Sequence, residues 1–199
     1  MARPALLQNT NAIGNMLTEL PPALRPAVTL VLGGARSGKS AYAEALAAEA
    51  ASALYLATAE ARDAEMAERI RRHRERRGRR WTTVEEPIAL VPALKQHAQP
   101  DRPVVVDCLT LWLSNLMAAG RDVADETARL VEGLAATTGP VVLVANEVGL
   151  GIVPDTPLGR DFRDHAGRLN QAVAGIADRV VFVVAALPLV LKDMAAKAS

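Results

Sequence analysis

A glycine-rich segment at residues 33–40 has the residue types and spacing of a phosphate-binding loop, G-x-x-x-x-G-K-[ST]. Its members are Gly33, Gly34, Ala35, Arg36, Ser37, Gly38, Lys39 and Ser40. Glycines let successive N–H groups turn inward around an anion, and a following helix N-terminus adds positive charge. Lys39 can reach the β- and γ-phosphates, and the Ser40 hydroxyl can ligate Mg²⁺. The alternative is a chance glycine turn, but the apolar run before the segment and the alanine-rich stretch after it favour a nucleoside triphosphate site.

Two acidic residues each end an apolar run further along the chain. Asp107 follows Val104–Val106, where a P-loop enzyme needs a carboxylate to hold Mg²⁺ through bound water. The alternative role of Asp107 is to cap the following helix. Glu147 can order a water, a substrate hydroxyl or the loop behind it, or it is a buried acid paired with an arginine. The metal role is favoured for Asp107, and both interpretations of Glu147 stay open.

The segment 69–80 is strongly basic. It contains eight arginines and one acid, Glu75, so it carries +7; because the whole chain carries +1, the remainder carries −6. On a helix, one face would hold or border Arg69, His73, Arg76, Arg77 and Arg80. Like charges at this spacing repel, so the sequence predicts an anionic partner, and a triphosphate fits bidentate arginine donors.

His73 lies among these arginines, which bias it towards its neutral, nucleophilic form. Two alternatives stay open: a solvated basic helix with an uninvolved histidine, and a nucleic-acid patch. Trp81 is adjacent, but no aromatic residues are interleaved for base stacking, which weakens the second alternative. From composition alone, His73 is therefore a candidate nucleophile.

Apolar runs alternate with helical patterns along the chain. Strands are expected at 28–32, 53–57, 104–107, 141–145 and 179–184, and helices at 39–51, 63–77, 87–97, 109–117, 122–136 and 158–177. Residues 81–86 read as extended or loop, and the residues after 184 read as helical or frayed. Strands that are apolar on both faces, alternating with helices, predict an α/β fold with a mostly parallel sheet covered on both sides. Residues 1–27 read as an extension before a single domain at 28–199.

Composition narrows the function classes further. The only cysteine, Cys108, excludes an intramolecular disulfide and a cysteine-based zinc site, which fits the cytoplasm. Residues 1–27 lack the layout of a secretory signal. The longest apolar run, 180–191, is interrupted by Pro188 and is too short to span a bilayer, so we expect no membrane insertion.

Several motifs, taken in order, resemble one enzyme family over about residues 28–192. They are Gly33–Ser40, Arg69-Ile70-x-x-His73-Arg74, Trp81-x-x-x-Glu85, Asp107–Leu116, Asn146–Pro154 and Phe162–Asn170. The family is the bifunctional adenosylcobinamide kinase/adenosylcobinamide-phosphate guanylyltransferase of cobalamin biosynthesis. The P-loop alone is unspecific, whereas the ordered set is specific.

The resemblance implies two reactions. ATP or GTP phosphorylates adenosylcobinamide, and a histidine, matched here by His73, then carries GMP from GTP to adenosylcobinamide phosphate, giving adenosyl-GDP-cobinamide. Implied nucleotide contacts are the P-loop residues with Thr58, Ala59, Glu60, Arg74, Glu75, Arg76, Arg77, Glu85 and Asp107. Lys39 is expected to serve both reactions, and Ser40 and Asp107 to hold Mg²⁺. The resemblance also implies a RecA-like sheet and a homotrimer, and it leaves residues 1–27 unmatched.

Two rival functions remain compatible with the P-loop. One is a P-loop kinase of another small hydroxylated substrate, which would form no covalent nucleotide adduct. The other is a nucleic-acid-stimulated ATPase, which predicts steeply salt-dependent binding to DNA or RNA. The acidic remainder of the chain argues against it, so we expect no nucleic-acid partner.

Overall fold

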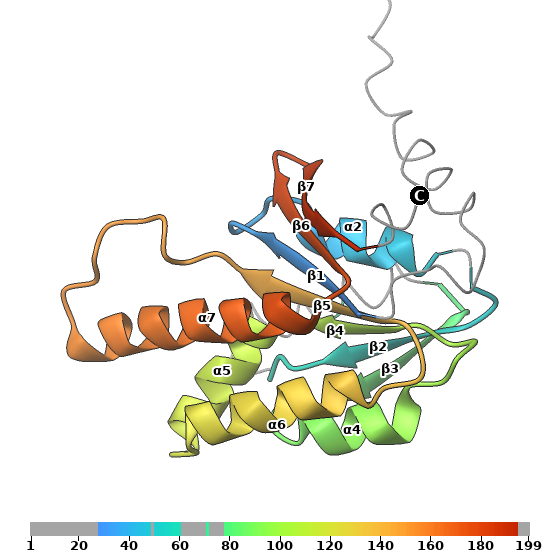
Figure 1. The fold of residues 1–199 in the computed structure, drawn as a ribbon, viewed down its shortest axis with the longest axis horizontal. Helices are drawn as coiled ribbons and strands as arrows, with labels where there is room; N and C mark the ends of the chain where they lie inside the picture. Colours follow the sequence, from blue (N-terminus) through green and yellow to red (C-terminus); the bar gives the residue numbers. More distant parts are fainter. Residues whose placement is uncertain (1–27, 49, 61–70, 72–77, 195–199) are drawn as a thin grey trace, which may run out of the picture.

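The central feature is a twisted sheet, seen in a computed structural model that describes residues 28–48, 50–60, 71 and 78–194. Seven strands of this part of the chain pair in the order β3-β2-β4-β5-β1-β6-β7 (Figure 1). The strands are β1 (Val28–Gly33), β2 (Ala53–Ala57), β3 (Trp81–Glu85), β4 (Val104–Asp107), β5 (Val141–Asn146), β6 (Arg179–Val184) and β7 (Leu187–Asp193). All neighbours are parallel except β6 and β7, which are antiparallel.

Helices cover both faces of the sheet. They are α2 (Lys39–Leu46), α4 (Leu90–His97), α5 (Leu109–Ala118), α6 (Val123–Ala135) and α7 (Pro157–Ile176). Figure 1 shows α2 on one face and the other four helices on the opposite face. No helix in the described part of the chain is long and apolar enough to cross a membrane.

The alternation of side chains along each strand divides the core into two layers. Val104 and Val106 of β4 pack towards α4–α7 together with the buried Trp112, whereas Val105 packs towards α2. Tyr55 of β2 belongs to the α2 layer. Because both faces are covered, the central strands are apolar throughout, which explains why their sequence runs lack a polar alternation.

All five strands expected from the sequence are present, and residues 81–85 form an additional strand, β3. The helix expected at 39–51 ends earlier, at Leu46. The helix expected at 63–77 lies outside the described residues, apart from Arg71.

The expectation of a helical or frayed segment after residue 184 is wrong for residues 187–193. Residues 187–193 form β7, which continues from β6 through a tight turn at Ala185 and Ala186, with φ of 50° and 63°. Hairpin turns with positive φ usually contain Asn-Gly or Asp-Gly, and this turn contains neither. Antiparallel pairing with β6 therefore overrides the weak local signal.

Candidate nucleotide site

The P-loop joins β1 to α2 at the carboxyl edge of the sheet. β1 ends at Gly33, and α2 begins at Lys39 directly after Gly38, whose φ is 98°. A Cβ on Gly38 would also lie 3.1 Å from Cα of Ala186, so both the backbone conformation and the space require glycine here. The segment therefore adopts a strand–turn–helix layout, which is the context that the G-x-x-x-x-G-K-[ST] pattern requires.

Lys39 is buried at the base of this loop. Its side chain is only 8% exposed, and Nζ donates a hydrogen bond of 2.9 Å to the carbonyl oxygen of Gly34. The ammonium group thus bonds back to the start of the same loop. Oγ of Ser37 is buried and accepts or donates no hydrogen bond within the described residues. A buried hydroxyl and a buried cation inside one loop fit an anion that brings several oxygen acceptors.

The turn between β6 and β7 fixes the shape of the P-loop. The backbone N–H of Ala186 donates a 2.8 Å hydrogen bond to the carbonyl oxygen of Ser37. At the start of the loop, a Cβ on Gly33 would lie 2.5 Å from the carbonyl oxygen of Val183 in β6. The P-loop is therefore held from outside by the last hairpin of the sheet.

Asp107 ends β4 on the same face as α2. The hydroxyl of Tyr55 donates a hydrogen bond to Oδ2 of Asp107. Tyr55 is 5% exposed, and its ring packs edge-on against Trp81, with ring centroids 6.2 Å apart. Sequence reasoning missed Tyr55, because its link to Asp107 depends on the register that pairs Tyr55 with Val105 and Ala57 with Asp107.

Ser40 and Asp107 form a donor set that fits Mg²⁺. Ser40 lies in the first turn of α2, which follows β1. Asp107 lies at the end of β4, which is separated from β1 by one strand, β5. No group of three or more His, Cys, Asp or Glu side chains in the described part of the chain forms a metal cluster. A hydroxyl and a carboxylate suit Mg²⁺ bound with a triphosphate, because that ion takes few protein ligands and keeps several waters.

Thr58 is fully buried. Its hydroxyl accepts from the N–H of Cys108 and donates to the carbonyl oxygen of the same residue, both at 2.8 Å. Nδ2 of Asn115 donates to the carbonyl oxygens of Thr58 and Pro87, at 2.8 and 3.2 Å. The Thr58 side chain thus joins the end of β2 to that of β4, and Asn115 ties the segments after β2 and β3 to α5. A contact between Thr58 and nucleotide stays a prediction.

Cys108 is not placed as a nucleophile. Burial and, second to it, the nearby carboxylate of Asp107 raise the pKa of its thiol to about 11. The thiol is therefore protonated at neutral pH, and the reactive form of cysteine is the thiolate.

Glu147 follows β5 and belongs to the loop behind it. Its backbone N–H donates to the carbonyl oxygen of Gly33 at 3.1 Å, which links this loop to the P-loop. Its Oε1 accepts from the N–H of Gly149 at 2.5 Å. Of the roles expected for Glu147, ordering the loop behind it is the one that these contacts show.

The other expected nucleotide contacts divide into two groups. Ala59 is partly exposed, and Glu60 and Glu85 are exposed at the ends of β2 and β3, the same edge as the P-loop. His73, Arg74, Glu75, Arg76 and Arg77 lie outside the described residues. Their place relative to the P-loop stays a prediction.

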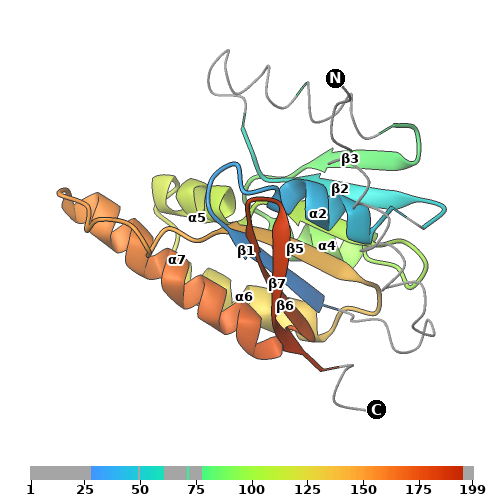
Figure 2. The same cartoon turned by 90° about the horizontal axis from the view of Figure 1, so that it is seen from above.

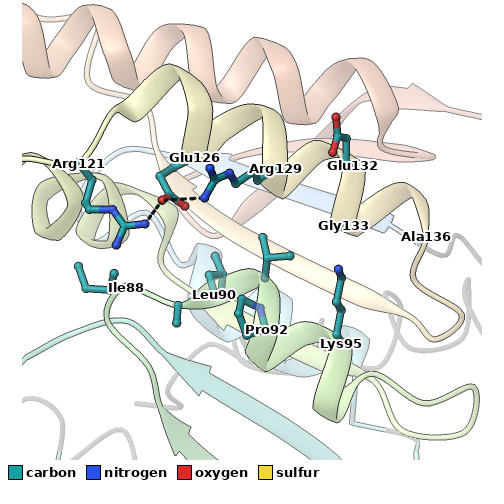
Figure 3. A pocket seen from close by; sticks show the side chains of 12 residues that line it. Ile88, Leu90, Pro92, Lys95, Arg121, Glu126, Arg129, Glu132, Gly133 and Ala136 are labelled. Carbon is teal, nitrogen blue, oxygen red and sulfur yellow. Dashed lines mark hydrogen bonds and ion pairs between the residues drawn. The ribbon is translucent and has the colours of Figure 1, made fainter.

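A pocket of about 380 Å³ lies between α4 and α6, away from the P-loop (Figure 3). Glu126 accepts from Arg121 on one side and contacts Arg129 on the other, at 3.8 Å. Because α4 and α6 cover the sheet face opposite α2, this pocket is not part of the phosphate site.

The hydroxyl of Tyr55 is expected to position Asp107 for metal binding. Replacing Tyr55 with phenylalanine keeps the ring on Trp81 but removes the hydrogen bond, so the Mg²⁺ concentration for half-maximal GTP binding should rise about tenfold. Titration calorimetry of GTP binding over a series of Mg²⁺ concentrations measures this requirement. Tyr42→Phe is the matched control, because Tyr42 lies on α2 near Arg179 and Asp193. An unchanged Mg²⁺ requirement in Tyr55→Phe would show that the hydroxyl does not position Asp107.

Comparisons with known proteins agree with this site. A family described as cobinamide kinase/cobinamide phosphate guanyltransferase matches residues 29–191. The bifunctional adenosylcobalamin biosynthesis protein CobP of Pseudomonas aeruginosa is 50% identical over 166 residues, covering 82% of this chain and 96% of that protein. The bifunctional adenosylcobalamin biosynthesis protein CobU of Salmonella typhimurium is 40% identical over 178 residues, covering 82% and 98%.

A solved structure supports the fold alone. It comes from a structural study of project PH0250 of Pyrococcus horikoshii, with a TM-score of 0.50, 9% identity, and coverage of 84% of this chain and 87% of that one. The predicted fold class, a RecA-like P-loop NTPase with a mostly parallel sheet and helices on both faces, is confirmed. From the family match and the identity to its relatives, the chain belongs to the cobinamide kinase/cobinamide phosphate guanyltransferase family and is an enzyme of cobalamin biosynthesis.

Proposed function

We propose that this enzyme acts twice on one corrinoid. First, the γ-phosphoryl group of ATP or GTP passes to the hydroxyl of the aminopropanol arm of adenosylcobinamide. Then a ring nitrogen of His73 attacks the α-phosphorus of GTP, an N–P bond forms and pyrophosphate leaves. A phosphate oxygen of adenosylcobinamide phosphate takes the GMP, giving adenosyl-GDP-cobinamide and free histidine. The observation that carries this proposal is the P-loop, with buried Lys39 and with Asp107 on the same sheet face, in a member of this family.

The triphosphate is assigned to the carboxyl edge of the sheet. Backbone N–H groups of residues 33–40 would surround the phosphates, and the ammonium of Lys39 would exchange the carbonyl oxygen of Gly34 for phosphate oxygens. Ala59, Glu60 and Glu85 lie at the same edge and are assigned to the nucleotide, as is Thr58 through its backbone.

Ser40 and Asp107 are assigned to Mg²⁺. The ion would neutralise charge on the phosphates when bound, and the described residues supply a hydroxyl and a carboxylate for it. Tyr55 holds one oxygen of Asp107 and leaves the other for bound water.

His73 and its arginine neighbours are assigned to guanylyl transfer. Arg74, Arg76 and Arg77 would stabilise the charge that develops as pyrophosphate leaves, and Glu75 belongs to the same nucleotide-binding segment. Covalent catalysis divides a difficult transfer into two easier ones. The support for this assignment is the match of the family motif to residues 69–74.

Three further assignments accompany the proposal. Residues 28–199 act as one catalytic domain behind an extension at 1–27, and the reactions take place in the cytoplasm, which the single cysteine, Cys108, supports. The active form is a homotrimer without nucleic acid. Self-association is supported by exposed apolar side chains at the open edge of the sheet, namely Leu187, Leu189, Val190 and Leu191 of β7.

The test is incubation of the protein with Mg²⁺ and GTP labelled at the α-phosphate, followed by denaturation and mass analysis of peptides. We expect a GMP adduct on His73 that is labile to acid and stable to base, as a phosphoramidate is. Bound nucleotide without an adduct would leave the alternative of a P-loop kinase for another small hydroxylated substrate.

A further inference from the structure

The loop between β5 and α7 exposes a group of aliphatic side chains. Ile152 is 97% exposed, Leu150 83%, Leu158 68% and Val153 56%. Residues 148–158 contain a single charged side chain, Asp155. We call residues 148–158, which are this loop and the first two residues of α7, the apolar loop. So much aliphatic surface in one short segment marks a binding surface, since water contact with it costs free energy.

The apolar loop has a fixed backbone at both ends. At its start, Oε1 of Glu147 accepts from the N–H of Gly149 at 2.5 Å. At its end, Thr156 caps α7 by accepting from Gly159, and Arg160 donates to the carbonyl oxygens of Pro154 and Asp155 at 3.0 and 2.8 Å. The aliphatic side chains are therefore presented by a backbone held in place without their help, which is typical of a preorganised surface.

The apolar loop begins beside the phosphate site. Gly33 of the P-loop pairs with Asn146 in the sheet, and the next residue, Glu147, donates its N–H to Gly33. The hydroxyl of Thr110, three residues after Asp107 and in the first turn of α5, accepts from the N–H of Asn146 at 2.7 Å. Figures 1 and 2 both show the loop extending past the carboxyl edge of the sheet, along the end of α7. A phosphoryl acceptor approaches from beyond this edge.

We propose that the apolar loop binds the corrin macrocycle of the acceptor, which holds the hydroxyl of its side arm near the γ-phosphate. This assignment rests on the proposed function. A corrin ring offers broad faces and methyl groups, and aliphatic side chains pack against such faces without aromatic stacking. The chain has only 3% aromatic residues, so few rings are available to stack on so large a ligand. A surface of aliphatic side chains can bind it instead.

A second copy of the chain is the competing occupant. Self-association is better supplied by β7, because an edge strand also offers unpaired backbone groups to a neighbour. The apolar loop is a connection rather than a strand edge, and its base contacts the phosphate site. These features favour the acceptor, and oligomeric mass decides between the two in the experiment.

The experiment uses the full chain with Leu150 and Ile152 both replaced by serine. Both side chains are exposed, so the folded state should not change. Binding of adenosylcobinamide is measured by equilibrium dialysis with corrinoid absorbance, and KM is measured in the kinase assay. We expect the Kd for adenosylcobinamide and its KM to rise at least about tenfold. GTP affinity, GMP-adduct formation and the oligomeric mass measured by light scattering should stay unchanged. Met194→Ser is the control. Met194 is also an exposed apolar residue, but it follows the end of β7 that is far from the P-loop.

Each result has one meaning. Unchanged corrinoid binding in the double variant, with an active wild-type enzyme, overturns the inference and leaves the proposed function standing. A fall in oligomeric mass together with weaker corrinoid binding also overturns it, because the loop is then an interface between copies. A wild-type enzyme that neither binds nor phosphorylates adenosylcobinamide refutes the proposed function itself.

Discussion

Replacement of Lys39 by alanine is expected to lower both cobinamide phosphorylation and GMP-adduct formation by at least about a hundredfold. The ammonium group is buried in the P-loop, 2.9 Å from the carbonyl oxygen of Gly34, where a triphosphate would lie. If both reactions use this one triphosphate site, as proposed, both should fail together. Rates are measured separately, with labelled γ-phosphate for the first reaction and labelled α-phosphate for the second.

Lys95→Ala is the matched control for Lys39→Ala. Lys95 is an exposed lysine on α4, on the sheet face opposite α2, so its loss should leave both rates within about twofold of wild type. If Lys39→Ala lost one reaction and kept the other at its normal rate, the two reactions would not share a triphosphate site, and the single-site proposal would be wrong.

Replacement of His73 by alanine is expected to separate the two activities. Removing the nucleophile should lower GMP transfer by at least about a thousandfold, because the covalent route is lost. The proposed phosphorylation of adenosylcobinamide does not use the His73 nucleophile, so a substantial part of that rate should remain. The products, adenosylcobinamide phosphate and adenosyl-GDP-cobinamide, are separated by chromatography and counted in the same reaction.

His165→Ala is the control for the histidine substitution. His165 lies on α7, outside the P-loop and outside the basic segment, so both products should form at normal rates. Normal production of adenosyl-GDP-cobinamide by His73→Ala would refute the assignment of the nucleophile. Loss of both products would indicate that residue 73 is needed to bind the triphosphate rather than to attack it.

The central part of the fold could be predicted because its signals are local. β1, β4 and β5 are short runs of valine and leucine that are buried on both faces, and each is followed by a turn or helix signal. β7 could not be predicted in the same way. Its seven residues stay partly exposed and include Pro188, and only pairing with β6 makes them a strand.

The candidate site likewise has one part that local sequence predicts and another that it does not. The P-loop is contiguous in sequence, so residue types and spacing were enough to identify it. The hydrogen bond from Tyr55 to Asp107 joins residues 52 positions apart, and nothing in the sequence near either residue announces it. Asn115 likewise acts through the carbonyl oxygens of Thr58 and Pro87, which only the folded sheet brings to α5. Such partners depend on register, and register is a property of the assembled sheet.

The contact between the last hairpin and the P-loop has a consequence for protein synthesis. β1 emerges early, but both of its neighbours, β5 and β6, come from residues 141–184, and the turn that bonds to Ser37 comes at 185–186. A ribosome that has made only the first two thirds of the chain therefore displays the P-loop sequence without the strands that shape it. We expect the nascent chain to gain nucleotide affinity only when its final strands have left the ribosome, so that ligand stabilises finished molecules and not partial ones.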